Sequence, residues 1–571
     1  MTAAQIREKI IAAVSENGGH LASSLGAVEI SMALAKVFEP QRDRIIWDVG
    51  HQAYAWKILT GRDISSLRKL DGVSPFPNPN ENAADAAVAG HAGVALSVAL
   101  GMAAARDRMG RNENVVAVIG DGAIVNGTSF EALNNCSMAT NKVIVVLNDN
   151  EMSISRPTGS FAKLLGKLIT GVRYNRIKAA TEAAGHKLKL TPLRGIYHKI
   201  ESSIKSWFVG NRFFEQFGLR YIGPIDGHNL KALESAFVVA KEDKRSVIVH
   251  VVTKKGKGFP PAEKDPTAWH GVSRFSIDDP RLEERKRDWS ASFGEALVAA
   301  ARADKRIVAI TAGMRDGTGL GEFAKEFPDR FFDVGIAEGH MVAFAPGLAA
   351  AGMRPVVAIY QTFLQRGWDQ MLMDVCLQKL PVLFLADRSG LGADDGPTHH
   401  GVFGLPALFS MPGLTILAPC CRVEMQQMID ASLAMDGPAV ILYPRSEGEK
   451  APAAASFVPG HWNTVRSGAD GTLLAFSSMV ETAVEAAERA EQQGVHLAVI
   501  NASTLQPLDE ATLKSLAGKP LYTLEESVLS GGFGSHVAGY CLKEKLPAPR
   551  LQMGIPDVFV PFGDRKELLR R

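Results

Sequence analysis

The sequence contains few cysteines for its length. Its 571 residues include five, at Cys136, Cys376, Cys420, Cys421 and Cys541, and no two are spaced as C-x-x-C. Small secreted scaffolds use denser, paired cysteines to compensate for a small core. The scarcity argues against a disulfide framework, and we expect reduced, mostly buried thiols.

Long apolar runs and an excess of one charge are also absent. No run of about 18 apolar residues occurs, which is the length that a membrane-spanning helix needs. Lys and Arg number 63 against 61 Asp and Glu, so the net charge of +2 gives no general attraction for polyanions. The start of the chain mixes charged with apolar residues and lacks the pattern of a secretory signal. These absences argue against a membrane span and a nucleic-acid partner, and they predict a cytoplasmic protein.

The composition is that of a folded protein with several domains. Hydrophobic residues make up 46% of the chain and charged residues 22%, the ordinary mixture of a globular protein. At about 150 residues per domain, a chain of this length is expected to hold three or four hydrophobic cores.

Short runs rich in Val and Ile recur along the chain, separated by segments long enough for a helix. Continuous apolar runs of this kind are typical of parallel strands that are buried on both faces. The runs form three groups and predict three successive, doubly wound α/β domains with mostly parallel sheets, at residues 1–285, 286–455 and 456–571. The runs lie at residues 115–119, 143–147, 246–253, 306–311, 355–360, 381–386, 414–418, 472–476, 496–500 and 520–523.

A basic segment interrupts the first group of runs. Residues 156–215 contain 12 Lys or Arg against 3 Asp or Glu and show no strand pattern. We interpret the segment as an insertion in the first domain, either a solvated helical one or a lid over an anionic ligand.

Two predicted strand ends carry residues that suit a metal ion and a phosphate group. Gly120, Asp121 and Gly122 follow one apolar run, and Asn150 follows the next. If these strands are neighbours, a carboxylate and an amide oxygen face one crevice, where diphosphate oxygens, a backbone carbonyl and water would complete the oxygen shell of Mg²⁺. The glycines would let backbone N–H groups approach the phosphate oxygens.

The paired strand ends resemble the signature of thiamine-diphosphate enzymes, and further stretches narrow the resemblance to one family. These stretches are similar to the 1-deoxy-D-xylulose-5-phosphate synthase family of transketolase-like enzymes, over nearly the whole chain from His20 to about Phe562. They are residues 19–26 (GHLASSLG), 47–54 (WDVGHQAY), 253–256 (TKKG), 262–266 (AEKDP), 362–366 (TFLQR) and 395–401 (DGPTHHG).

The resemblance implies an activity, a fold and partners. The implied reaction condenses pyruvate with glyceraldehyde 3-phosphate, releases carbon dioxide and forms 1-deoxy-D-xylulose 5-phosphate. The implied fold is the transketolase-like, thiamine-diphosphate-binding fold, with thiamine diphosphate and Mg²⁺ as cofactors and a homodimer as the assembly. The protein would position and polarise a cofactor that performs the carbon chemistry.

The resemblance also assigns catalytic and cofactor-binding positions. Glu338 falls where the family places the carboxylate that hydrogen-bonds the aminopyrimidine ring. His20, His270 and His399 fall at catalytic positions, where a histidine can act as acid, base or neutral donor near pH 7. Without the resemblance, each histidine would be interpreted as structural and Glu338 as a surface acid at a strand end. The implied cofactor-binding residues are His51, His91, Ala92, Gly93, Gly120, Asp121, Gly122, Ala123, Asn150, Lys255, Phe259, Glu338, Phe363 and Arg366, and the implied metal ligands are Asp121, Asn150 and Met152.

A substrate site is implied in the second domain. Arg388 and Arg445 match the family's phosphate-binding arginines, and the arginine fork suits a phosphate dianion. Taken alone, these arginines would be interpreted as members of surface ion pairs. The implied substrate-binding residues are Tyr360, Arg366, Arg388, Asp395, His399 and Arg445.

Several positions depart from the family pattern. Gly339 stands where a glutamine is usual, and Gln361 replaces a small serine. A buried polar group left without a partner discriminates strongly between substrates, so substrate choice is open. The alternatives are a thiamine-diphosphate enzyme with another donor and acceptor, including a transketolase, or a catalytically silent cofactor-binding paralogue. The other departures are Ala92 and Gly93 in place of serines, Phe259 in place of tyrosine, Ala55 and Trp56 in place of proline and histidine, and Ser446 in place of glycine.

Overall fold

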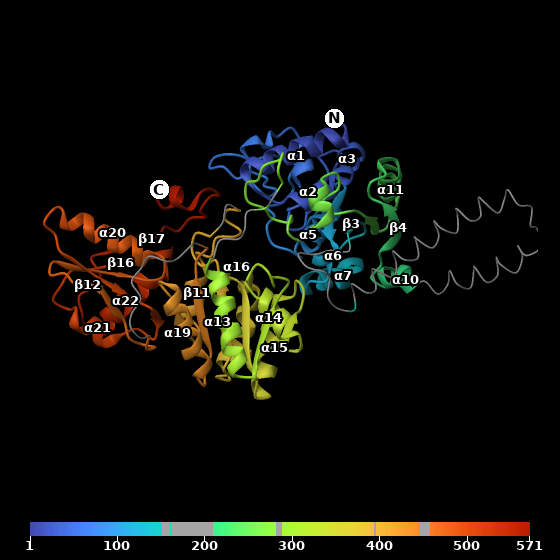
Figure 1. Cartoon of the computed structure of the whole chain (residues 1–571). Coiled ribbons are helices and arrows are strands. Elements are labelled where there is room, and N and C mark those ends of the chain that lie inside the picture. Colours follow the sequence, from blue (N-terminus) through green and yellow to red (C-terminus); the bar gives the residue numbers. More distant parts are fainter. Residues whose placement is uncertain are drawn as a thin grey trace, which may run out of the picture. The chain divides into compact units, whose positions relative to one another are not determined.

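The computed structural model describes residues 1–150, 160, 209–280, 282, 288–392, 395–445 and 457–570. Met152, Ser446 and most of the basic segment 156–215 lie outside these residues. The chain divides into two compact units, Met1–Glu283 and Glu284–Arg571. Figure 1 labels the helices and strands of both units.

The first unit is built on a five-stranded parallel sheet in the order β1-β2-β3-β5-β4. β2 and β3 are neighbours, with Gly120 opposite Asn148, so their carboxyl ends open at the same edge of the sheet. The strands are β1 (Arg44–Trp47), β2 (Val115–Gly120), β3 (Ile144–Asp149), β4 (Arg220–Asp226) and β5 (Val247–Val252). The helices are α1 (Ala3–Asn17), α2 (Leu21–Gly26), α3 (Val28–Val37), α4 (Tyr54–Leu59), α5 (Ala95–Arg108), α6 (Asp121–Ile124), α7 (Gly127–Ala139), α10 (Val209–Gln216), α11 (Leu230–Glu242) and α12 (Pro260–Lys264).

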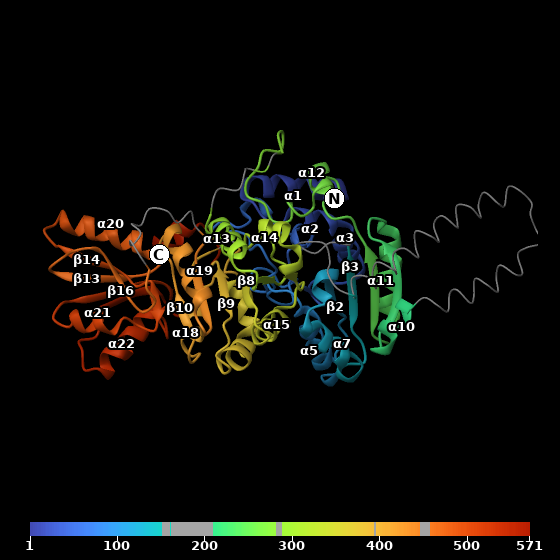
Figure 2. The ribbon, with the colours of Figure 1, turned by 60° about the horizontal axis from the view of Figure 1, so that its bottom comes forward.

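Alternate side chains of this sheet supply two hydrophobic cores. Ala117 and Ile119 of β2 pack with α5 and α7, whereas Val116 and Val118 pack with α3 and α11. Figure 2 shows α5 and α7 next to each other beside β2. Because helices cover both faces, the inner strands β2, β3 and β5 are buried on both sides, whereas the edge strand β4 is partly exposed.

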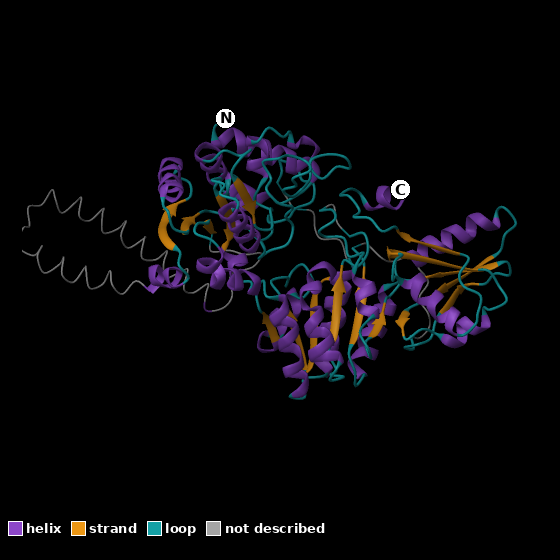
Figure 3. Ribbon diagram, turned by 180° about the vertical axis from the view of Figure 1, so that it is seen from behind, coloured by secondary structure: helices purple, strands orange, loops and turns teal. Residues whose placement is uncertain are grey.

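The second unit contains two sheets, the larger of which has seven strands in the order β15-β10-β11-β9-β8-β6-β7. Helices flank these strands (Figure 3). The strands are β6 (Ile307–Thr311), β7 (Phe331–Asp333), β8 (Arg354–Tyr360), β9 (Leu383–Asp387), β10 (Thr415–Leu417), β11 (Ala439–Tyr443) and β15 (Thr504–Gln506). The helices are α13 (Trp289–Ala303), α14 (Gly321–Glu326), α15 (Glu338–Ala350), α16 (Gln361–Leu364), α17 (Trp368–Gln370), α18 (Gly404–Phe409) and α19 (Arg422–Ala434).

The smaller sheet of this unit has five strands in the order β12-β14-β13-β16-β17, and only β12 runs antiparallel to its neighbour. Figure 1 shows α20 on one side of this sheet and α21 and α22 on the other. The elements are β12 (Asn463–Arg466), β13 (Gly471–Ala475), α20 (Met479–Glu491), β14 (Leu497–Asn501), α21 (Glu510–Ser515), β16 (Leu521–Val528), α22 (Phe533–Lys543), β17 (Leu551–Ile555) and α23 (Arg565–Arg570).

One strand links the two sheets of the second unit. β15 belongs to the C-terminal part of the sequence, yet it pairs antiparallel with β10 of the larger sheet, where Ile416 is opposite Gln506. The C-terminal part therefore completes the edge of its neighbour's sheet, and the two sheets belong to one compact unit.

The architecture confirms the predicted α/β class with mostly parallel sheets. Each predicted run coincides with a strand, but β1, β4, β7, β11, β12, β15 and β17 were not predicted. All five cysteines are buried and unpaired, as expected. Within the described ranges, no helix is long and apolar enough to cross a membrane.

Candidate active site

The carboxyl ends of β2 and β3 bring the predicted metal ligands to one edge of the first sheet. Asp121 begins α6 directly after Gly120, and Asn150 directly follows β3. A Cβ atom on Gly120 would find no other atom within 4 Å, so there is open space beside this turn. A phosphate group needs such space, beside the start of a helix, to approach the backbone.

Asp121 is buried among other charged groups. Burial, together with the negative charge of Asp149, raises the pKa of its carboxyl group to about 8, although Lys255 opposes the shift. Burial also lowers the pKa of Lys255 to about 8. A cation bound here would stabilise the ionised carboxylate. In the described part of the chain, no group of three or more His, Cys, Asp or Glu could hold a metal ion, so an ion here would also need oxygens from Asn150 and a phosphate ligand.

Hydrogen bonds fix the two residues before Asn150. Asn148 accepts a hydrogen bond from Thr253 Oγ1 at 2.6 Å. Asp149 lies with its Oδ2 atom 2.9 Å from His250 Nε2, and both side chains are buried. The backbone that presents Asn150 is therefore anchored through its neighbours' side chains.

Three predicted histidines form a cluster in the first unit. The ring centres of His20 and His51 are 6.0 Å apart, those of His20 and His270 are 5.6 Å apart, and those of His51 and His270 are 5.4 Å apart. Burial lowers the pKa of both His51 and His270 well below the usual value, and the positive charge of Lys255 adds to the shift. Both rings are therefore neutral near pH 7 and can donate or accept a hydrogen bond.

Residues that were not predicted support this cluster. Tyr54 Oη accepts a hydrogen bond from the backbone N–H of His20 at 3.1 Å. Ser23 Oγ lies 3.2 Å from His270 Nδ1. The Phe76 ring centre lies 5.6 Å from that of His20. The cluster is thus held by polar contacts from Tyr54 and Ser23 and by the ring of Phe76.

Two polar atoms beside the cluster indicate that a ligand completes it. No protein atom in the described ranges forms a hydrogen bond with the buried atoms His51 Nδ1 and Gln52 Nε2. Leaving a buried polar atom unsatisfied costs about 1–3 kcal/mol. A small polar ligand, or water in its place, would supply the missing partners.

The turn that carries His91 is fixed by a buried aspartate. Asp48, directly after β1, accepts hydrogen bonds from the backbone N–H groups of Gly93 at 2.8 Å and Ala95 at 3.0 Å. His91, Ala92 and Gly93 lie in this turn before α5. The predicted cofactor-binding turn is therefore anchored to the end of β1.

The structure accommodates glycine at position 93 in a specific way. Gly93 has a φ of +83°, and a Cβ atom there would lie 2.5 Å from Cγ and Oδ1 of Asn126. Asn126 thus occupies the space that a serine side chain would need. The glycine that replaces the family's serine at position 93 therefore leaves room for the Asn126 side chain.

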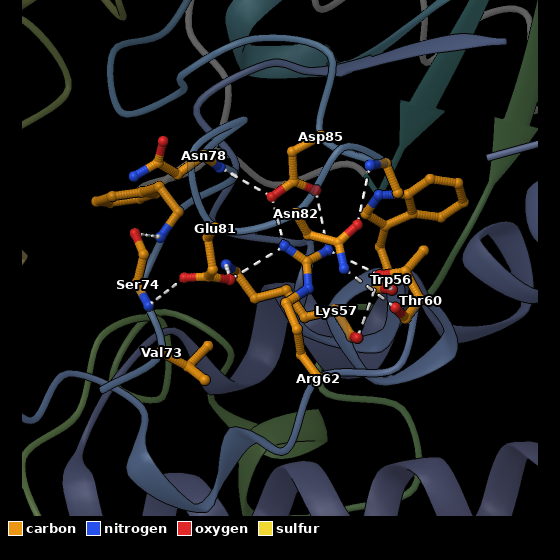
Figure 4. A network of polar contacts seen from close by, with 12 residues as sticks. Trp56, Lys57, Thr60, Arg62, Val73, Ser74, Asn78, Glu81, Asn82 and Asp85 are labelled. Carbon is orange, nitrogen blue, oxygen red and sulfur yellow. Dashed lines mark hydrogen bonds and ion pairs between the residues drawn. The ribbon is translucent and has the colours of Figure 1, made fainter. Parts of the chain in front are cut away.

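Figure 4 shows a network of charged side chains around Lys57, Arg62, Glu81 and Asp85. Lys57 Nζ is 2.6 Å from Glu81 Oε1, and Arg62 Nη1 is 3.0 Å from the same oxygen and 2.5 Å from Asp85 Oδ2. Lys57 and the Asp85 side chain are fully shielded from solvent. Two cations and two carboxylates therefore compensate each other in a largely buried network, in which the Glu81 side chain is 18% exposed.

This network holds the loop that contains Phe76. Glu81 Oε2 accepts a hydrogen bond from the backbone N–H of Ser74 at 2.6 Å, and Asp85 Oδ2 accepts one from Asn78 N–H at 2.8 Å. Figure 4 shows the two carboxylates pointing toward the loop backbone. The network therefore fixes the loop on both sides of Phe76, the ring that contacts His20.

In the second unit, Glu338 begins α15 and is 4% exposed. Arg366 Nη1 lies 3.5 Å from both of its carboxylate oxygens. Asp333, at the end of β7, accepts hydrogen bonds from the backbone N–H groups of Gly313 at 2.8 Å and Gly335 at 3.0 Å. The loop that leads to Glu338 is thereby fixed, and an arginine faces the carboxylate.

Four predicted side chains form a second group in this unit. The Arg388 guanidinium carbon lies 3.7 Å from the centre of the Tyr360 ring. The Phe363 ring centre is 5.7 Å from that of Tyr360 and 5.6 Å from that of His399. The three rings and the guanidinium group form a continuous surface of aromatic and cationic side chains.

Arg388 and Arg445 follow the ends of the neighbouring strands β9 and β11, at the same edge of the sheet. Asp387, the last residue of β9, pairs with Tyr443, the last residue of β11, and the arginines follow one and two residues later. Arg388 has a φ of +62°, which is uncommon for a residue other than glycine and is typical of functional positions. Asp395 is buried in the loop that follows β9.

Two departures from the family pattern have different surroundings. A Cβ atom on Gly339 would lie 3.7 Å from Arg366 O and 3.8 Å from Gln370 Oε1, which is ordinary contact. Gln361 is 1% exposed, and neither end of its amide has a hydrogen-bond partner among the described residues. Gln361 borders a small hollow of about 30 Å³ that is also lined by Ser389, Gly390, Ser477, Ser478 and Glu526.

One predicted cofactor residue lies in a core. The ring of Phe259 packs in a hydrophobic cluster, with its centre 5.1 Å from the indole of Trp269 and 5.9 Å from the ring of Phe275. The structure therefore shows a packing role for Phe259. Of the unpredicted residues, Asp48 and Tyr54 lie inside the 47–54 motif, which could have indicated them, whereas no motif indicated Phe76.

Comparisons with known proteins cover nearly the whole chain. Family models described as 1-deoxy-D-xylulose-5-phosphate synthase, as transketolase pyrimidine binding domain and as transketolase C-terminal domain match residues 1–253, 285–450 and 460–571. The 1-deoxy-D-xylulose-5-phosphate synthase of Desulforudis audaxviator is 47% identical in an alignment of 575 positions that covers 98% of this chain and 90% of that protein. Proteins of the same name from Clostridium kluyveri and Natranaerobius thermophilus are each 44% identical over 98% and 99% of this chain, and over 91% and 92% of their own lengths.

Proposed function

Because the chain belongs to the 1-deoxy-D-xylulose-5-phosphate synthase family, we propose that it condenses pyruvate with D-glyceraldehyde 3-phosphate. Pyruvate loses its carboxyl group as carbon dioxide, one proton is taken up, and the remaining two carbons join the aldehyde to form 1-deoxy-D-xylulose 5-phosphate. The observation that supports this most strongly is 47% identity to a synthase over 98% of the chain. The transketolase-like fold and the classification as a transferase follow from the same matches.

We propose thiamine diphosphate and Mg²⁺ as the cofactors. Asp121 and Asn150 would supply oxygens to the ion, and the open space at Gly120 and the turn at His91 would receive the diphosphate. When bound, thiamine diphosphate supplies the carbon nucleophile and the electron sink that decarboxylation requires. Glu338 would hydrogen-bond the aminopyrimidine ring, and the Arg366 guanidinium group faces its carboxylate.

The histidine cluster is the proposed site for the donor. His20, His51 and His270 are held close together, and the low pKa values of His51 and His270 keep those two rings uncharged. Neutral rings can donate a hydrogen bond to the carbonyl oxygen of a keto acid without trapping its carboxylate in a tight ion pair. Lys255 supplies positive charge beside them.

The second group of side chains is the proposed site for the acceptor. Arg388 and Arg445 would bind the phosphate group, because guanidinium groups form paired hydrogen bonds with phosphate oxygens. Tyr360, Asp395 and His399 would orient the aldehyde and its hydroxyl group. Arg388 is already fixed against the Tyr360 ring, so little side-chain entropy remains to be lost on binding.

A donor assay tests this proposal against a transketolase. The purified protein is incubated with Mg²⁺, thiamine diphosphate and glyceraldehyde 3-phosphate, with either pyruvate or a ketose phosphate as donor. We expect carbon dioxide release and a deoxypentulose phosphate with pyruvate only. Turnover of the ketose phosphate alone would indicate a transketolase, and cofactor binding without turnover of either donor would indicate a silent paralogue. We also propose a homodimer, which light scattering would detect as twice the mass of the chain.

A further inference from the structure

The loop that follows β9 is fastened to the C-terminal part of the second unit. This loop contains Arg388, Asp395 and His399, the residues proposed to bind the acceptor. Its Leu391 N–H donates a hydrogen bond to Glu526 Oε1 at 2.7 Å. Farther along the loop, His400 Nε2 lies 3.0 Å from Pro561 O, and Val402 O accepts a hydrogen bond from Val528 N–H at 3.1 Å. The C-terminal part therefore contacts the loop at several points.

Glu526 is the centre of these contacts. It is 6% exposed and accepts hydrogen bonds from Leu391 N–H, from Ser478 Oγ at 2.9 Å and from Arg565 Nε at 2.9 Å. Arg565 Nη2 bonds the second carboxylate oxygen, so the guanidinium group holds Glu526 from two atoms. The charge of the buried carboxylate is compensated, and its direction toward Leu391 is fixed.

The contact with Glu526 lies next to a strained arginine. Arg388 has a φ of +62°, and two residues later a Cβ atom on Gly390 would lie only 2.9 Å from Glu526 Cδ. Strained backbone persists only where the surroundings hold it in place. On the other side, Ser389 N–H donates to Tyr443 O at 3.0 Å, so the segment after Arg388 is held between β11 and Glu526.

Packing around these hydrogen bonds is close but incomplete. A small hollow of about 30 Å³ lies between the loop and the C-terminal part, and its lining includes Ser389, Gly390, Ser477 and Glu526. The Ser477 hydroxyl is buried without a hydrogen-bond partner in the described part of the chain. The position of the loop here thus depends on polar bonds as well as on packing.

We propose that Glu526, held by Arg565, is a positioning residue of the acceptor site. It acts through the Leu391 N–H group and the backbone next to Gly390 to keep Arg388 over the Tyr360 ring, where the phosphate of the acceptor would bind. This inference rests on the proposed function and gives the C-terminal part a role in acceptor recognition.

The adjacent glutamate offers a matched control. Glu525 is also buried, but it accepts hydrogen bonds from Phe533 N–H and Gly534 N–H at 2.7 Å, within its own sheet and helix layer. Glu525→Gln and Glu526→Gln each remove the charge of a buried carboxylate in β16. Of the two side chains, Glu526 bonds the loop that follows β9, so only the second change is expected to affect that loop.

Steady-state kinetics separates positioning from general stability. We expect Glu526→Gln to raise the KM for glyceraldehyde 3-phosphate about tenfold, while the KM for pyruvate changes less than about twofold. Glu525→Gln is expected to change neither KM, even if it lowers the melting temperature as much. Arg565→Gln is the second variant and is expected to show the same selective loss. Equal effects of Glu525→Gln and Glu526→Gln, or equal effects on both substrates, would overturn the proposal.

Hydrogen exchange gives a readout that does not depend on turnover. We expect the amides of residues 389–392 and 395–402 to exchange faster in Glu526→Gln than in the wild type, and to be unchanged in Glu525→Gln. If the wild type turned over neither substrate, the proposed function would fail. The exchange pattern would still show whether Glu526 holds the loop that follows β9. Unchanged exchange in Glu526→Gln would overturn the positioning role of Glu526.

Discussion

Two glycines near the candidate site replace side chains that the family pattern contains, and their surroundings differ. Gly93 combines a left-handed backbone with Asn126 in the space beyond its Cα atom, whereas a side chain on Gly339 would meet only ordinary contacts. The sequence alone could identify both as departures. It could not separate them, because the difference depends on which neighbour the fold places beside each glycine.

Restoring the usual residue should therefore have different effects on stability at these two positions. Gly93→Ser is expected to lower the free energy of unfolding by about 1–3 kcal/mol, because Cβ would overlap Asn126 and the φ angle disfavours a side chain. Gly339→Gln, in the first turn of α15, is the control and is expected to be neutral or to stabilise by up to about 1 kcal/mol. Urea denaturation measures both, and equal stability of the two variants would contradict this account.

The buried histidines predict how stability changes with pH. The pKa of His51 and His270 is lowered in the folded protein, so the unfolded chain takes up protons first as the pH falls below about 6.5. Their contribution to stability is complete above that pH and declines below it, by about 1.4 kcal/mol per pH unit for each ring. Denaturation between pH 7.5 and 5.5 should show this slope reduced in His51→Gln. An unchanged slope in that variant would show that the pKa of His51 is the same in the folded and the unfolded protein.

At the scale of elements, the parallel strands were the most predictable part of the fold. Buried strands such as β2, β3 and β9 are continuous apolar runs, and each was predicted, although the equally buried run of β11 was missed. β4 and β17 are mostly half-buried, and β7 and β15 have three residues each, so their pattern is weak. Loops were less predictable still, because the position of Phe76 depends on charges at residues 57, 62, 81 and 85 that meet only in the folded chain.

The charge network should be cooperative. Lys57→Met leaves Arg62 as the one cation between the Glu81 and Asp85 carboxylates, and it is expected to lower the free energy of unfolding by about 3 kcal/mol, the lower end for breaking a buried pair. Adding Glu81→Gln restores the charge balance, so the double variant should lose less stability than the sum of the single variants. Thermal or urea unfolding of the four proteins of this cycle measures the coupling. Strict additivity would show that the two side chains do not stabilise each other.

At the scale of the whole molecule, the family explains why motifs far apart in the sequence belong to one enzyme. The motifs predicted a strand-end metal site, a set of histidines and two arginines for the acceptor. The structure places the two strand ends side by side, clusters three of the histidines, and has both arginines follow neighbouring strands at one sheet edge. The sequence did not predict that β15 joins the larger sheet of the second unit or that Glu526 holds the loop after β9. Both depend on long-range contacts that leave no periodic pattern in the sequence.

The most direct test follows labelled carbon from donor to product. The purified protein is given Mg²⁺, thiamine diphosphate, glyceraldehyde 3-phosphate and pyruvate labelled with carbon-13 at its carbonyl carbon, with Glu338→Ala as the control that should fold but not turn over. We predict that the label enters the carbonyl carbon of 1-deoxy-D-xylulose 5-phosphate, with one carbon dioxide released per product molecule. Pyruvate that stays unchanged while the cofactors are bound, or equal product formation by Glu338→Ala, would contradict the proposed reaction or its catalytic carboxylate.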